Sequence, residues 1–295
     1  MKDEEIELRY FYRFILLFII GSCLLFLPVR AEAAAISKTM QTTADSKRLT
    51  APVTVSNTAS VQKKWYQTAR TIMHAAGGIG KTDYTNSKEA LKTNLKRGKR
   101  LIEIDFRFTT DGTLVCNHDW NNNKGKPLSL ASFLGTKTSG GYTPQTAEEA
   151  VKTIAAFKNA YLVADSKESD IAKVYQELVD ICKRTGNTSF LNRIVVQLYY
   201  KSDYTKVKKI YAFKNWNFTL YRLKPSKDKE YKDIASFCKK NGIQTITMRY
   251  NWVTNARMKI LKKYGITGLA YTVNSKSTYK KLRKLGITAI FTDFL

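Results

Sequence analysis

The stretch LIEIDFRFTTDGTLVCNHDW, residues 101–120, contains two apolar runs separated by an Asp-Gly dipeptide. Asp-Gly between two apolar runs is a strong sequence signal for a two-residue β-hairpin turn. A hairpin joins antiparallel strands, whereas parallel strands need a longer crossover connection. The stretch therefore predicts two antiparallel strands, over 101–108 and 113–118, that turn at Asp111 and Gly112.

From about residue 63 onward, short apolar runs alternate with amphipathic segments. This alternation favours parallel βα units, and the Val/Ile/Leu-rich strands are typical of strands buried on both faces. With the second hairpin strand set aside, eight parallel strands remain, the number that closes a barrel. We predict an α/β fold, a (β/α)8 TIM barrel with an extra β-hairpin strand after its second strand. Strands are expected at 71–75, 101–108, 113–118, 160–165, 193–199, 218–223, 244–249, 267–273 and 287–293, and helices at 86–97, 147–157, 169–184, 203–212, 228–240, 253–263 and 275–285.

Residues 1–35 have the features of a signal peptide or a membrane anchor. An apolar run at 14–29 is flanked by basic residues and followed by alanines in an A-x-A arrangement. This pattern is typical of a secretory signal peptide, with an uncleaved anchor as the alternative. Residues 36–65, rich in Ser, Thr and Ala, are expected to be a flexible linker before a barrel domain at 66–295. We therefore expect an extracellular or cell-envelope protein.

The chain is strongly basic, with a formal net charge of +26, and residues 201–295 hold 22 Lys/Arg against 5 Asp/Glu. Such a field attracts polyanions, and an exported location favours an anionic membrane or cell-wall surface. A solvated lysine face that only confers solubility is the alternative. Nucleic acid is not expected, because aromatic residues such as Tyr199 and Tyr221 lie in or beside expected strands and helices and fit a core.

The cysteines outside the N-terminal segment are Cys116, Cys182 and Cys238. An odd number at wide spacing is neither a disulfide framework nor a zinc pattern. Buried free thiols are the favoured interpretation, although one bridge remains open.

The hairpin also brings acidic residues together. With a two-residue turn, Asp105 lies opposite His118, and Glu103 shares their face of the strand pair. Asp165, at the end of the next expected strand, adds a third acid. Clustered carboxylates suit Mg²⁺ or Ca²⁺; pairing with Lys or Arg from neighbouring strands is the alternative.

The chain contains only two histidines, His74 and His118. His74 ends the first expected strand, at the edge where barrel enzymes hold their active sites. Two imidazoles beside a divalent cation suit phosphodiester cleavage, because one accepts a proton and the other donates one. Lys167, two positions after Asp165, could neutralise a phosphate oxygen. A lone histidine packed in the core is the alternative for each.

These residues resemble the glycerophosphodiester phosphodiesterase family, a branch of the phosphatidylinositol-phospholipase-C-like barrel superfamily. The resemblance covers about residues 72–294 and implies a (β/α) barrel with His74 and His118 as general acid and base. It also implies that Glu103, Asp105 and Asp165 are metal ligands. The matching pieces are HAAGG, YTNSKEAL, EIDFRFTTDGTLVCNHDW, LVADSK, VVQL, AYTVN and GITAIFTD.

The chain departs from the family pattern at three positions. Ala75 replaces the usual Arg after the first histidine, a lost phosphate contact that we expect Lys167 or Arg107 to supply. Asp165 replaces the usual Glu and is shorter by one methylene, so the cation would lie deeper or use a water. Tyr271 replaces a Trp and changes a pocket wall.

The resemblance implies an exported phosphoric diester hydrolase that cleaves glycerophosphodiesters to an alcohol and glycerol phosphate. Its substrates would be small diesters, phospholipids or teichoic-type polymers. One alternative is a phospholipase C- or D-like enzyme acting on membrane lipids. Another is a non-catalytic barrel that binds the envelope.

Overall fold

The computed structural model describes residues 64–295. The predicted signal peptide or anchor at 1–35 lies outside the described residues, as does the predicted linker at 36–65 up to residue 63. Within residues 64–295, the helices are all too short or too polar to cross a membrane.

Eight parallel strands form a closed barrel. The order around the ring is β1-β9-β8-β7-β6-β5-β4-β2, and β2 pairs with β1 to close it. The remaining strand, β3, pairs antiparallel with β2 outside the ring. The strands are β1 Thr71–Met73, β2 Leu101–Phe108, β3 Leu114–Cys116, β4 Tyr161–Ser166, β5 Ile194–Leu198, β6 Asn215–Thr219, β7 Thr245–Arg249, β8 Thr267–Tyr271 and β9 Ala289–Thr292. The predicted TIM barrel with an extra hairpin strand is confirmed.

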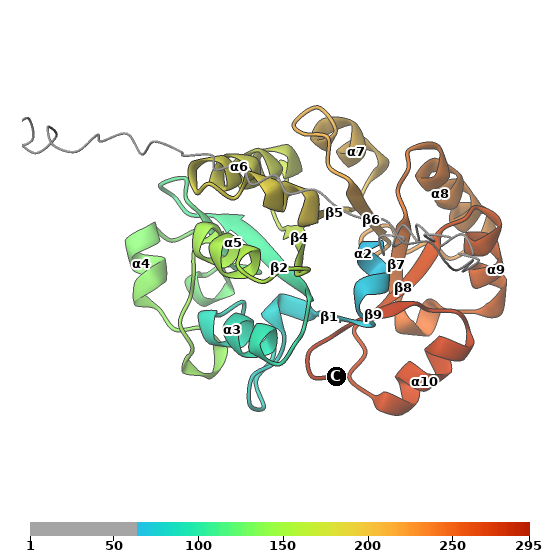
Figure 1. Ribbon diagram of the computed structural model, residues 1–295, viewed down its shortest axis with the longest axis horizontal. Coiled ribbons are helices and arrows are strands. Elements are labelled where there is room, and N and C mark those ends of the chain that lie inside the picture. Colours follow the sequence, from blue (N-terminus) through green and yellow to red (C-terminus); the bar gives the residue numbers. More distant parts are fainter. Residues whose placement is uncertain (1–63) are drawn as a thin grey trace, which may run out of the picture. The chain divides into compact units, whose positions relative to one another are not determined.

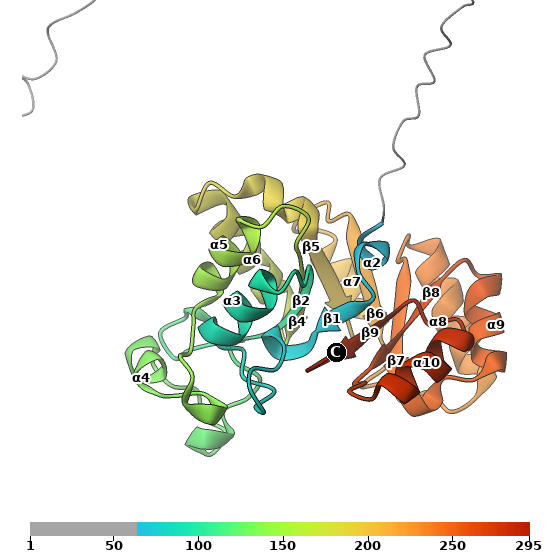
Figure 2. The same ribbon diagram turned by 60° about the horizontal axis from the view of Figure 1, so that its bottom comes forward.

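Helices surround the strands, with α3, α5 and α6 on one side and α8, α9 and α10 on the other (Figures 1 and 2). Several begin at a Ser, Thr or Asp whose side chain accepts a backbone N–H, as Ser87 does at α3 and Thr146 at α5. The sequence did not predict the short helices α2 and α4. The helices are α2 Trp65–Thr68, α3 Lys88–Lys96, α4 Leu130–Gly135, α5 Ala147–Ala155, α6 Ile171–Arg184, α7 Lys201–Val207, α8 Asp228–Lys240, α9 Asn255–Lys263 and α10 Lys276–Lys284.

The barrel interior is apolar at one end and polar at the other. Inward-facing residues near the strand beginnings, including Leu101, Val163 and Val195, form one buried cluster with Trp65 and Tyr66 of α2. Further along the strands, the buried inward-facing residues are polar: Glu103, Asp105, Asp165, Gln197, Asn217, Thr219, Thr245 and Thr247. The barrel is therefore plugged at its N-terminal end, and its polar groups gather at the C-terminal end.

The predicted hairpin register is wrong by one residue. Phe106 pairs with Cys116, and the residue opposite Asp105 is Asn117, whose backbone N–H donates to the Asp105 carbonyl at 3.0 Å. The loop has three residues rather than two, because Gly112 adopts a left-handed φ of +79° before Thr113. His118 therefore lies beyond the end of β3, and strand alternation does not set its direction.

Strand β6 begins and ends earlier than the predicted 218–223. Its buried Asn217 donates to Gln197 Oε1 at 3.0 Å and accepts the hydroxyls of Thr245 and Thr247 at 2.8 and 2.9 Å. This satisfied network outweighs the low strand propensity of Asn. Tyr221, which we expected in the core, instead lies after the strand and is 57% exposed.

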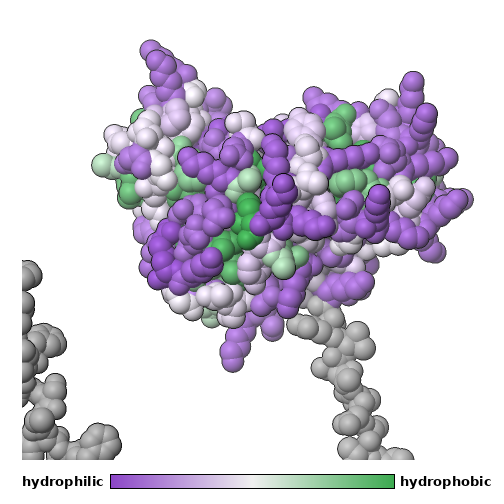
Figure 3. Space-filling model, turned by 90° about the horizontal axis from the view of Figure 1, so that it is seen from above, coloured by the Kyte–Doolittle hydropathy of each residue, from purple (hydrophilic) through white to green (hydrophobic). Residues whose placement is uncertain are grey.

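The three cysteines of the described chain are free and buried, as predicted. Hydrophilic residues predominate on the face shown in Figure 3, and hydrophobic residues gather there only in small separate areas. Binding of this basic surface to an anionic membrane or cell wall stays a prediction.

Candidate active site

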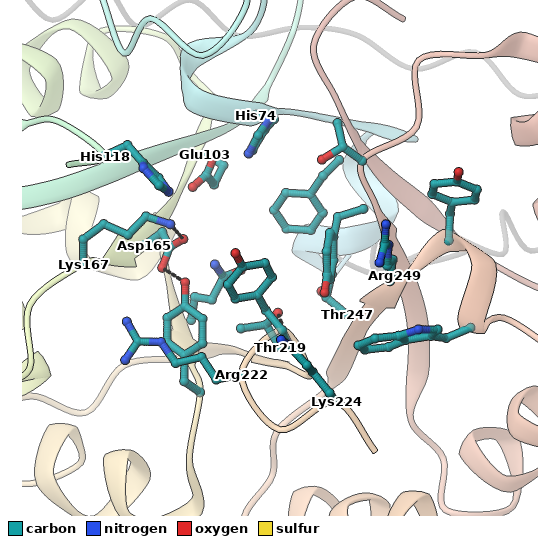
Figure 4. A pocket seen from close by; sticks show the side chains of 18 of the residues that line it. His74, Glu103, His118, Asp165, Lys167, Thr219, Arg222, Lys224, Thr247 and Arg249 are labelled. Carbon is teal, nitrogen blue, oxygen red and sulfur yellow. Dashed lines mark hydrogen bonds and ion pairs between the residues drawn. The ribbon is translucent and has the colours of Figure 1, made fainter. Parts of the chain in front are cut away.

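A cavity of about 810 Å³ opens at the C-terminal end of the barrel (Figure 4). Its volume is within the usual range of small-molecule sites. The lining includes His74, Glu103, His118, Asp165 and Lys167, five of the seven residues predicted from the sequence. Of the other two, Asp105 is fully buried beside the cavity, and Arg107 lies outside its lining.

Three buried carboxylates meet below the cavity. Glu103 and Asp105 come from β2, and Asp165 lies beside Asp105 on the neighbouring strand β4. One oxygen from each lies within 4.8 Å of the others. Burial and the neighbouring Asp105 raise the pKa of Glu103 well above its usual value. The Oδ1 of Asp105 is buried, and its polar neighbour is the Lys167 ammonium, at 3.0 Å. A crowded set of hard carboxylate oxygens fits a divalent cation such as Mg²⁺ or Ca²⁺.

Lys167 lies among these acids. Its Nζ is 3.0 Å from Asp105 Oδ1 and 2.7 Å from Asp165 Oδ2. Burial alone would lower the pKa of Lys167, but Asp165 and Asp105 raise it above its usual value. The ion pairing that the sequence left open as an alternative is thus present for two of the three acids. One ammonium balances one carboxylate charge, so a further cation would favour the cluster with all three acids ionised.

His74 is held by a buried carboxylate. Its Nδ1 lies 2.9 Å from Asp293 Oδ1, and Asn274 Nδ2 donates to the other oxygen of Asp293 at 2.6 Å. Burial lowers the pKa of His74, but the bond to Asp293 and the charges of Glu103 and Asp105 outweigh it and raise that pKa to about 9. Because Nδ1 faces Asp293, Nε2 is the nitrogen left for chemistry in the cavity.

His118 is held in a similar way but nearer to solvent. Its Nδ1 lies 2.8 Å from Asp119 Oδ2, and the side chains of the pair are 35% and 37% exposed. Arg107 Nε donates to the His118 carbonyl at 2.8 Å, and Arg107 also lies 3.8 Å from Glu168. Arg107 does not line the cavity: the end of β2 runs beside β3, and Arg107 contacts the His118 backbone. Its role at the substrate stays a prediction.

The ring of Tyr84 lies between the two histidines. Its centroid is 4.6 Å from that of His74 and 4.9 Å from that of His118, both edge-on. The chain's only two imidazoles therefore flank a single aromatic ring.

The loop after β1 is strained. Ala75, Ala76, Tyr84 and Asn86 all have positive φ, between 47° and 70°. Such backbone is costly for residues other than Gly and clusters at functional sites. Here it directs polar groups onto the acids. The N–H of Ala75 donates to Glu103 Oε2 at 2.6 Å, and Asn86 Nδ2 donates to Asp105 Oδ2 at 2.8 Å.

Sequence reasoning assigned no role to Tyr84, Asn86, Tyr199 or Asp293. Tyr199 donates its hydroxyl to Asp165 Oδ1 at 2.5 Å, so it orients the third acid. Three of the four lie in pieces that carry the family resemblance, YTNSKEAL and GITAIFTD, which was the available signal. Their partners lie far away in the chain, since Asp293 contacts a residue 219 positions earlier, and periodicity cannot reveal such a contact.

Known proteins share both sequence pattern and fold with this chain. The model of the glycerophosphoryl diester phosphodiesterase family matches residues 78–295. No curated protein sequence matches the chain. A candidate glycerophosphodiester phosphodiesterase from Galdieria sulphuraria is 16% identical, with a TM-score of 0.65 and coverage of 76% of this chain and 94% of that one. A Parabacteroides distasonis glycerophosphodiester phosphodiesterase is 19% identical, with a TM-score of 0.60 and coverage of 76% and 93%.

A third solved structure is an Oleispira antarctica phosphodiesterase in complex with its product sn-glycerol-3-phosphate. It is 18% identical, with a TM-score of 0.61 and coverage of 77% of this chain and 93% of that one. At these sequence identities the solved structures show only a shared fold, and the match to the family model shows the family to which the chain belongs. The chain belongs to the glycerophosphoryl diester phosphodiesterase family and is a phosphodiester hydrolase.

Proposed function

We propose that this protein is an exported, metal-dependent enzyme that hydrolyses glycerophosphodiesters to an alcohol and glycerol phosphate by His/His general acid–base catalysis. One observation carries the proposal: two imidazoles, each held through Nδ1 by a carboxylate, flank the cavity above three buried acids. Family membership supports the diester substrate. The solved Oleispira complex supports glycerol phosphate as the product class.

The acids would hold the metal. Glu103, Asp105 and Asp165 offer the oxygen ligands, and a bound Mg²⁺ or Ca²⁺ supplies stabilisation for charge that develops on the phosphate oxygens. Lys167 places its ammonium at the same end of the cavity, where it favours binding of an anionic diester. The apolar plug of the barrel keeps water from reaching the acids from below.

The histidines move the protons. The Nε2 of one imidazole accepts a proton from the attacking water or substrate hydroxyl, and the Nε2 of the other donates one to the leaving alkoxide. Asp293 and Asp119 fix the orientation of the rings, because each binds the opposite nitrogen. Tyr84 packs edge-on against both rings and so helps to hold their orientation.

Two substrates with different leaving groups test these roles. His74→Ala and His118→Ala should each abolish hydrolysis of glycerophosphocholine, whose alkoxide leaving group needs a proton. On bis(p-nitrophenyl) phosphate, whose phenolate leaves unaided, the variant that lacks the general acid should retain much more activity than the other. Wild-type turnover by either variant on glycerophosphocholine would remove that histidine from the mechanism.

Metal removal tests the cation. Exhaustive chelation with EDTA should abolish hydrolysis, and Mg²⁺ or Ca²⁺ added back should restore it. Activity that persists after complete chelation would reject the metal site.

Product analysis in the same assays identifies the attacking nucleophile. Attack by water gives a linear monoester, whereas attack by a hydroxyl of the substrate gives a cyclic phosphate first.

Export and surface binding are proposals that rest on the sequence alone. The apolar run at 14–29 and the following A-x-A motif support export, tested by N-terminal sequencing of the protein recovered outside the cytoplasm. The +26 charge supports binding to an anionic membrane or wall polymer, which should weaken as salt rises. Cytoplasmic retention would reject the first proposal, and salt-independent affinity the second.

A further inference from the structure

The cavity has a second charged side, built from cations. Arg222 and Lys224 lie on the loop after β6, and Arg249 is the last residue of β7; all three line the cavity. We call these three residues the cationic arm. Figure 4 shows them around the part of the cavity away from His74, Glu103 and His118.

The cationic arm has no acidic partner in the described chain. No Asp or Glu oxygen of residues 64–295 lies within 4.0 Å of Arg222, Lys224 or Arg249. The acids of the cavity lining, Glu103 and Asp165, belong to the metal cluster, which Lys167 already contacts. Three cations that converge on one cavity without counter-charges favour an anionic ligand, and arginine forks suit phosphate.

The members of the arm lie at different distances from the reaction centre: Arg222 and Lys224 follow β6, two strands from the Asp165 strand β4, and Arg249 ends β7. In the ring order, β7 is diametrically opposite β2, which carries Glu103 and Asp105. Eight strands spaced about 4.8 Å apart and tilted by about 36° close into a ring about 15 Å across. The backbone of Arg249 therefore lies about one barrel diameter from the strand that carries Glu103 and Asp105, and the cavity between them has room for a ligand with two charged groups.

Aromatic residues shape this side of the cavity. The guanidinium of Arg222 lies 4.5 Å over the Tyr199 ring, whose hydroxyl binds Asp165. Tyr221 and Tyr271 lie 5.9 Å apart between centroids and line the cavity beside Arg249. These rings form an apolar wall that suits the carbon atoms of a ligand between its two charged groups.

We propose that the cationic arm binds a second phosphate of the substrate, so that the preferred substrates are phosphodiesters with a further phosphate a few bonds from the scissile one. This inference rests on the proposed function and narrows its substrate class. The second phosphate belongs either to another diester of a poly(glycerol phosphate) chain or to a terminal monoester. Both present the same chemistry to the arm.

Matched substrates and variants test the arm. The full-length enzyme is assayed on glycerophosphoglycerol, on its phosphomonoester derivative and on a glycerol phosphate trimer, with Arg249→Gln and Lys224→Gln compared with wild type. The wild-type kcat/KM should be about tenfold or more higher for the two-phosphate substrates, a typical effect of one charge-assisted contact. In either variant the ratio should fall toward one. Arg97→Gln, an exposed cation after α3, is the matched control and should leave the ratio unchanged.

Each outcome decides something. A preference for the trimer over the monoester assigns the polymer as the source of the second phosphate, and the reverse assigns a terminal monoester. Equal loss on one- and two-phosphate substrates would overturn the proposal, because the arm would then act on the scissile phosphate. A similar fall of the ratio in Arg97→Gln would also overturn it, since net charge would explain the effect.

Calorimetric binding separates this inference from the proposed function. Wild type should bind glycerol 1,3-bisphosphate at least about tenfold more tightly than glycerol 3-phosphate, and Arg249→Gln should remove that difference. If wild type binds the bisphosphate more tightly than the monophosphate but hydrolyses no diester, the proposed function is refuted and the role of the cationic arm stands. If wild type hydrolyses diesters but binds the two phosphates equally, the role of the cationic arm is refuted and the proposed function stands.

Discussion

Asp293→Asn tests whether the carboxylate behind His74 positions it for proton transfer. Asn274 Nδ2 donates to Asp293 Oδ2. The side-chain amide of Asn274 cannot flip, because its Oδ1 already accepts from the Asp293 N–H at 2.8 Å and from the Thr292 hydroxyl at 2.9 Å. A new Asn at 293 must therefore offer its oxygen to Asn274 and its amide to His74. His74 would then be a neutral imidazole with its single proton on Nε2, the nitrogen that faces the cavity. It could neither accept a proton there nor donate one as the imidazolium that Asp293 stabilises.

The magnitude follows from the bond that is lost. A hydrogen bond to a charged group contributes about 1.5–3 kcal/mol, and each 1.4 kcal/mol is about tenfold in rate. The His74–Asp293 pair is buried, with side-chain exposures of 16% and 6%, so water screens it little. We expect the kcat of Asp293→Asn on glycerophosphocholine to fall about 100-fold, while KM changes by about threefold at most.

Asp119→Asn is the matched control, because Asp119 holds His118 through the same atom but is 37% exposed. Solvent screening should limit its loss to about threefold to tenfold. Steady-state kinetics of both variants, with circular dichroism to verify folding, make the comparison. A kcat within twofold of wild type for Asp293→Asn, or a larger loss for Asp119→Asn, would refute the reasoning.

Three further predictions concern the metal, the turn and the thiols. Asn86→Ala removes the amide that orients Asp105 and should weaken Mg²⁺ or Ca²⁺ binding by about 10–100-fold in a calorimetric titration; unchanged affinity would exclude this role. Gly112→Ala, at φ +79°, should lower the free energy of unfolding by about 1 kcal/mol in urea, whereas Gly135→Ala, with ordinary backbone, should not; equal effects would contradict the turn geometry. Burial raises the pKa of Cys182 and Cys238 to about 12, so an aromatic disulfide reagent should modify them only on unfolding; fast labelling of either in the native protein would show that it is accessible.

The sequence predicted the barrel because its signals are local. Apolar runs and amphipathic segments repeat along the chain, and each predicts one element without reference to the others. Asp111 and Gly112 correctly placed the hairpin. The register depended on whether the loop had two or three residues, which the sequence does not decide and which moved the residue opposite Asp105 from His118 to Asn117.

The site was predictable where its residues lie at strand ends, and less so where distant segments meet. Asp105 and Asp165 occupy corresponding positions on adjacent strands, and Glu103 lies two residues before Asp105 on the same face, so counting along the strands sufficed. The direction of Arg107 and the support of His74 by Asp293 depend on how the hairpin and the last barrel loop pack. The packing of the hairpin and of the last barrel loop produces no periodic pattern of residues in the sequence from which these contacts could be predicted.

Locating a bound cation tests the central claim most directly. Crystals grown with Mn²⁺, which shares the oxygen preference of Mg²⁺, would show the ion by its anomalous scattering. We predict one strong peak within coordination distance of carboxylate oxygens of Glu103, Asp105 and Asp165, on the side of the cavity that holds His74 and His118. Full hydrolytic activity in a protein whose only Mn²⁺ peaks lie elsewhere would contradict the account.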